Sequence, residues 1–75
     1  MNNSGTVAAL GEPALLQGFR LAGAVLYPAT GAAEVKAAWA RLPETVAAVI
    51  LTPGAASHLA GELNEPASPL AAVMP

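Results

Sequence analysis

The stretch that decides the fold is VAAVILT, residues 46–52. Its first six residues are all apolar, without the polar alternation of a strand that faces water on one side. An unbroken apolar run of this length is typical of a strand covered by protein on both faces, as in parallel sheets. We therefore expect a buried parallel strand here.

Three further apolar runs are spaced along the chain: TVAALG (Thr6–Gly11), AVLY (24–27) and LAAVM (70–74). Helix-like segments separate the four runs. This βαβαβαβ alternation predicts one four-stranded parallel sheet, with right-handed crossovers that place helices on both of its faces. The pattern alone leaves the strand order open.

The first helix is expected to begin at Pro13 and to end before Gly23, which suits a left-handed C-terminal position. Glu12 places a negative charge where the helix dipole favours it. Gly18 lies within this helix, in the stretch QGFRLAG (17–23), and we interpret it as a site of close helix–sheet approach. The inner face is expected to carry Leu15, Phe19 and Ala22, with Leu16 at its edge.

The second and third helices carry clearer signals. Thr30 is expected to cap a helix over residues 31–42 that stops at Pro43, and Thr52 is expected to cap a helix that starts at Pro53. The expected inner residues are Val35, Ala38, Trp39 and Leu42 in the second helix and Ala55, Ala56, Leu59 and Leu63 in the third.

Composition excludes several functions. A net charge of −2 with three basic residues argues against nucleic acid. The chain has no cysteine and no aspartate, so thiolate metal sites and an aspartyl phospho-acceptor are both absent. The chain has nineteen alanines and three aromatic residues. Because alanine buries little apolar area, we expect a thin core that depends on a partner for stability.

The residues that could carry chemistry are isolated. Gly11 is followed by Glu12 and Pro13 rather than by a G-x-G-x-x-G loop, and the Glu12 charge would repel a phosphate. His58 is the only histidine, and the five glutamates are scattered. We therefore expect no catalytic residue, no cofactor and no metal site.

Three stretches together resemble the F subunit of the V/A-type (vacuolar/archaeal-type) rotary ATPases and ATP synthases. The most specific is GFRLAG (18–23), preceded by the acidic turn Gly11-Glu12. VAAVILTPGAASHL (46–59) and SPLAAVMP (68–75) are similar to the family's third strand with its helix and to its closing strand. The spacing also fits, so the resemblance covers residues 6–75.

The resemblance implies a Rossmann-like α/β/α domain with strand order 2-1-3-4. It also implies a non-catalytic place on the central rotor stalk, bound to the coiled-coil D subunit, where ATP turnover is coupled to proton or sodium transport. We expect residues 1–75 to form one domain, with residues 1–5 disordered, in a cytoplasmic protein peripheral to the membrane. Gln17, Arg20 and Leu21 are the expected partner interface.

The chain departs from the family at two points. Pro53-Gly54 replaces an acidic turn, and the chain stops at Pro75 without the family's C-terminal tail. The alternative hypothesis is a small ligand- or nucleotide-sensing domain, because parallel α/β sheets bind ligands beyond the carboxyl ends of their strands. A freestanding enzyme that uses His58 or Glu12 is the least favoured.

Overall fold

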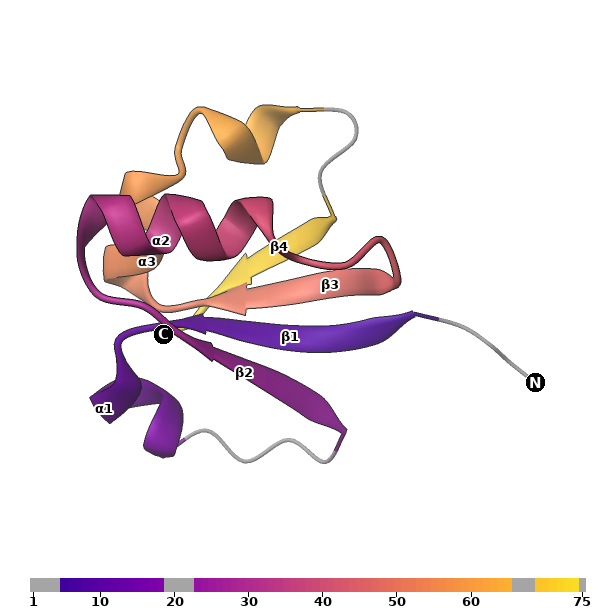
Figure 1. Cartoon of the computed structure of the whole chain (residues 1–75), viewed down its shortest axis with the longest axis horizontal. Helices are drawn as coiled ribbons and strands as arrows, with labels where there is room; N and C mark the ends of the chain where they lie inside the picture. Colours follow the sequence, from indigo (N-terminus) through magenta and orange to yellow (C-terminus); the bar gives the residue numbers. More distant parts are fainter. Residues whose placement is uncertain (1–4, 19–22, 66–68, 75) are drawn as a thin grey trace.

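The computed structural model describes residues 5–18, 23–65 and 69–74 of the 75-residue chain. Strands and helices alternate from β1 to β4 (Figure 1). Residues 1–4 lie outside the described residues, whereas Gly5 is described. The elements are β1 (Thr6–Gly11), α1 (Pro13–Gln17), β2 (Ala24–Pro28), α2 (Gly31–Ala40), β3 (Val46–Leu51), α3 (Pro53–His58), the 3₁₀ turn η1 (Glu62–Asn64) and β4 (Leu70–Val73).

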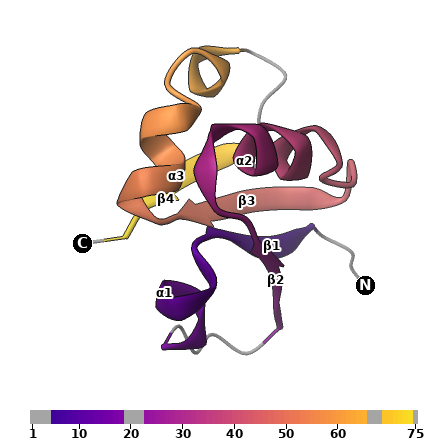
Figure 2. The same ribbon diagram turned by 60° about the vertical axis from the view of Figure 1, so that its left-hand side comes forward.

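The four strands form one parallel sheet in the order β2-β1-β3-β4. Helices α2 and α3 lie on one side of it and α1 lies on the other (Figure 2). The expected three-layer α/β/α fold is therefore confirmed, together with the strand order that the family resemblance implies. Among the described residues, no helix is long and apolar enough to cross a membrane.

The register of the strands decides which residues face which helices. Ala8 of β1 is aligned with Val25 of β2 and Val49 of β3, so these three side chains share the face covered by α2 and α3. Val7 and Ala48 are likewise aligned and face the side of α1. Successive residues alternate between faces, except at the start of β3, where the register shifts between Val46 and Ala48 and Val46 lies on the same side as Val49.

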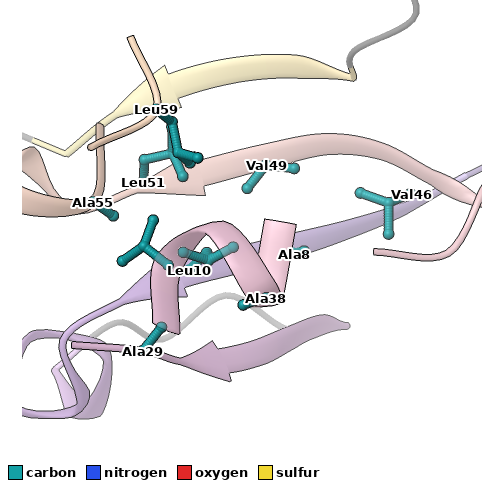
Figure 3. Close-up of a cluster of buried hydrophobic side chains, with 10 residues drawn as sticks. Ala8, Leu10, Ala29, Ala38, Val46, Val49, Leu51, Ala55 and Leu59 are labelled. Carbon is teal, nitrogen blue, oxygen red and sulfur yellow. The ribbon is translucent and has the colours of Figure 1, made fainter. Parts of the chain in front are cut away.

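The main core lies between the sheet and the pair α2 and α3 (Figure 3). Its members are small or branched aliphatic residues, which suits the alanine-rich composition. The residues expected to face inward do pack in or against this core, with Trp39, Leu42, Ala56 and Leu63 partly buried at its edge. The third helix is shorter than expected, however: α3 ends at His58, so that Leu59 is its C-cap and Leu63 lies in η1. The buried residues of the cluster are Ala8, Leu10, Ala29, Val35, Ala38, Val46, Val49, Leu51, Ala55 and Leu59.

The helix ends differ in detail from the sequence-based expectation. Helix α2 stops at Ala40, before Leu42. Its N-cap is Thr30, as expected, but the Thr30 side chain makes no capping bond; instead the Thr30 backbone N–H donates to the Glu34 carboxylate at 2.8 Å. The Thr52 hydroxyl does cap α3, as expected, by accepting from the Ala55 N–H at 3.2 Å.

Helix α1 contradicts two expectations. It ends at Gln17, so Gly18 is an exposed C-cap, and of the described residues a Cβ there would meet only the Leu15 carbonyl oxygen, at 3.9 Å. Gly18 is thus no site of close packing. Leu16 is the buried residue and Leu15 is 51% exposed.

The reason lies in the length of α1. The predicted inner face assumed more than two helical turns, for which residues four apart line up. A helix of five residues makes its contact through Leu16 instead. Phe19 and Ala22, the other expected inner residues, lie outside the described residues; Gly23 has the expected positive φ, +86°, but leads into β2.

We predict that Leu16→Ala lowers the free energy of unfolding by about 2–4 kcal/mol, because it empties a buried site between α1 and the sheet. Leu15→Ala, one residue earlier, should cost at most about 1 kcal/mol, because half of that side chain is in water. Urea denaturation followed by circular dichroism measures both. Equal losses in the two variants would contradict the observed orientation of α1.

Candidate functional site

The candidate site lies at the carboxyl ends of β1 and β3, where the strand order reverses. The chain leaves β1 towards β2 through α1 on one face, and leaves β3 towards β4 through α3 on the other. In open α/β sheets this divergence creates the crevice that normally binds ligands. Two loops border it here: Gly11-Glu12 after β1 and residues 52–54 after β3.

The two loops are joined by a hydrogen bond between side chains 40 residues apart. The Thr52 hydroxyl donates to the Glu12 carboxylate, and the same oxygen accepts from the Ala55 N–H. Thr52 is fully buried, and its backbone N–H donates to the Leu10 carbonyl of β1 at 3.2 Å. Every polar group of Thr52 that points towards the crevice therefore has a partner within the protein.

Two glycines make room for this pair. Gly11 has φ of +153°, and the position where a Cβ would stand is occupied by the Thr52 side chain. A Cβ on Gly54 would overlap the Glu12 carboxylate. The segments GE after β1 and TPG after β3 therefore form one arrangement. In each loop a glycine is required, because a side chain of the opposite loop occupies the place of its Cβ.

The surroundings of Glu12 favour its ionised form. The hydrogen bond from Thr52 lowers the pKa of the Glu12 carboxyl below its ordinary value of 4.5. The Glu12 backbone N–H and the charge of His58 act in the same direction, and partial burial opposes them. Glu12 is therefore a carboxylate at neutral pH, half-buried in the crevice.

This arrangement offers little to a reaction or to an anion. The partner of Glu12 is a threonine, and no hydrogen bond joins His58 to Glu12 within the described part of the chain. A fixed negative charge also stands at the amino end of α3, where a phosphate would otherwise be attracted. Nor do the described residues contain a group of three or more His, Asp or Glu side chains that could hold a metal ion.

Sequence reasoning gave Glu12 and Thr52 separate, local roles. The sequence predicts Thr52 as a helix cap and Glu12 as a charge near the start of α1 that repels phosphate, without joining the two. Glu12 is the N-cap residue of α1, but its side chain makes no capping bond and turns to Thr52 instead. The usable signal was a glycine in each of the two loops that follow the central strands.

Of the expected interface residues, Gln17 is the one among the described residues, and it does not border the crevice. Gln17 is exposed at the last position of α1. Arg20 and Leu21 lie outside the described residues, so their placement stays a prediction.

Comparison with known proteins adds no relative: no family model, no curated protein and no solved structure matches this chain.

Lowering the pH should reduce the free energy of unfolding by protonating Glu12. Because the folded-state pKa is depressed, ionised Glu12 stabilises the fold above about pH 4.5, and this contribution is lost as the pH falls through the folded-state pKa. We predict that wild type exceeds Glu12→Gln in free energy of unfolding at pH 7 and that the difference shrinks by pH 3. Urea titrations across this range measure it, with Glu44→Gln as the exposed control. A pH-independent difference would contradict the depressed pKa.

Gly54→Ala tests the fit between the loops. The new methyl group should push the flexible end of Glu12 aside, break the bond from Thr52 and raise the Glu12 pKa towards its ordinary value. Carboxyl ¹³C NMR titration measures this pKa directly. Gly61→Ala is the control, because a Cβ at that position meets no described residue within 4 Å. The same Glu12 pKa in both variants would show that Gly54 does not shape the site.

Proposed function

We propose that this chain is a non-catalytic central-stalk (rotor) subunit of a V/A-type rotary ATPase or ATP synthase. In this role it binds the coiled-coil D subunit and helps couple ATP turnover to proton or sodium transport, as a cytoplasmic protein peripheral to the membrane. The resemblance of GFRLAG and its neighbouring stretches suggests the family. The observation that carries a protein-binding role is the incomplete cover of the sheet.

The uncovered part of the sheet lies on the side of α1. Helix α1 packs on β1 and β2, whereas the residues of β3 and β4 that face the same way have no described helix over them. Leu70 is 78% exposed and Ala72 is exposed, and both lie beside half-buried β3 residues. We call this surface the open face; its residues are Ala48, Ile50, Leu70 and Ala72.

The chemistry of the open face suits a helix from a partner. Parallel sheets are normally covered on both faces, and the usual cover is a helix. The open face carries no charge, and Ala48 and Ala72 would let a helix backbone approach closely. The apolar stripe of a coiled-coil helix would cover the open face. Because such a partner binds the folded chain, it would also raise the stability that the thin core provides. Gln17, from the expected interface, belongs to the helix on this same side.

The crevice argues against the alternative role in ligand or nucleotide sensing. Its two loops are tied together by the chain's own carboxylate and hydroxyl, and the charge there is negative. A nucleotide would have to displace Glu12 against charge repulsion. A protein-binding role needs no such rearrangement.

Co-expression with a D-type coiled-coil subunit tests the proposal. A stable complex should co-purify, and Leu70→Glu should weaken it about tenfold or more, because an unpaired carboxylate would be buried in the interface. Ala71→Glu is the matched control: it adds the same charge to the neighbouring exposed residue, on the opposite face of β4. Absence of co-purification at micromolar concentration would refute the proposal, and equal effects of the two variants would refute the assigned surface.

A further inference from the structure

Strand β4 forms one border of the sheet, and its outer edge is open (Figure 1). It pairs with β3 on one side, and no strand among the described residues pairs with it on the other. All four of its residues are exposed, including Leu70 and Val73. An edge strand of this kind offers unpaired N–H and C=O groups to another strand.

The backbone groups of β4 alternate between the two sides of the strand. The Met74 N–H donates to the Leu51 carbonyl at 2.7 Å, so Met74 is bonded towards β3. Residues two positions apart along a strand direct their backbone groups to the same side, so Ala72 is also bonded towards β3. Ala71 and Val73 therefore direct their N–H and C=O away from β3, where no described strand meets them.

The opposite border of the sheet, β2, is protected where β4 is not. The Ala29 N–H donates to the Gly11 carbonyl at 2.8 Å, so by the same alternation Leu26 and Pro28 face outward. Pro28 has no N–H to donate, and proline on an edge strand is one of the devices that prevent further pairing. The outward residues of β4 are an alanine and a valine, without proline or charge, so this edge can accept another strand.

The sequence around β4 has nearly the same pattern in both directions from Ala72. The stretch is PLAAVMP (69–75), in which a proline stands three residues to either side of Ala72. Between the prolines, apolar residues occupy matching places: leucine matches methionine, and alanine matches valine. A strand that pairs antiparallel with its own copy meets its own sequence in reverse, so this symmetry fits a second copy of the chain. The stretch carries no charge, so two copies do not repel each other.

We propose that β4 pairs antiparallel with β4 of a second copy, centred on Ala72, and so joins two sheets into one. Ala71 is then opposite the partner's Val73, and each such pair exchanges both of its N–H···O bonds. Ala72 is opposite the partner's Ala72 in the closer, non-hydrogen-bonded type of pair. Leu70 lies beside the partner's Met74 on the side of the open face, where their contact removes apolar surface from water.

The size of this contact sets the strength of the dimer. One short edge buries less than the roughly 1,200 Å² at which standard specific interfaces begin, so we expect a Kd on the order of 10–100 µM. The dimer does not rest on the rotor role, because the backbone of an edge makes it, whereas the coiled-coil helix is proposed to cover a face. The experiments below use the chain without the coiled coil, so their failure would leave the rotor proposal untouched.

Single cysteines test the register, because the chain has none of its own. Ala72→Cys places two thiols opposite each other at a Cα separation of about 4.5 Å, within the range that a disulfide spans. In Ala71→Cys the two thiols are offset by two residues along the strands, about 7 Å, which puts their Cα atoms beyond that range. Under mild oxidation we expect Ala72→Cys to form the cross-linked dimer at least about tenfold faster, as measured by non-reducing electrophoresis. Equal rates would overturn the proposed pairing.

Sedimentation velocity of the full chain from about 5 to 500 µM measures the dimer itself. We expect wild type to shift from monomer to dimer over this range. Ala71→Lys should weaken the dimer at least about tenfold, because a charged side chain on an edge opposes pairing. Ala37→Lys adds the same charge to an exposed residue of α2 and should behave like wild type.

Circular dichroism of each variant shows that folded proteins are compared. A wild type that stays monomeric up to 500 µM would overturn the proposal, and so would an unchanged dimer in Ala71→Lys. Species that grow beyond a dimer would overturn it as well, because they require a head-to-tail contact in place of the symmetric β4 pair.

Discussion

The hydrogen bond from the Thr52 hydroxyl to the Glu12 carboxylate is the contact on which the carboxyl end of the sheet depends. It joins the two central strands just where their connections diverge to opposite faces. Thr52 is fully buried, so a hydroxyl left without its partner would cost about 1–3 kcal/mol. Gly11 and Gly54 follow from this contact, because a side chain at either position would occupy the space of the pair.

The same contact shapes what the molecule can do. In related architectures the carboxyl end of the sheet is the ligand site, whereas here the chain fills it with its own carboxylate. The open face over β3 and β4 remains exposed among the described residues. It is apolar and suits a partner helix.

Local signals predicted much of the fold and little of the site. The apolar runs predicted all four strands, and Thr52 with Pro53 predicted the start of α3. Both features depend on residues that are neighbours in the sequence, so a local pattern reveals them. The length of α1 was not predictable in this way, since its periodicity continued beyond the point at which the helix ends. The Glu12–Thr52 contact spans 40 residues, so it depends on the strand order, which no local pattern reveals.

NMR of ¹⁵N-labelled protein titrated with magnesium-ATP, and separately with inorganic phosphate, tests the closed crevice most directly. The amides of Gly11, Thr52 and Ala55 border the space that a phosphate would need. Because Glu12 and Thr52 occupy that space, we predict no saturable shift of these resonances with either ligand. A saturable shift confined to these amides would contradict the account and return the chain to the class of ligand-sensing domains.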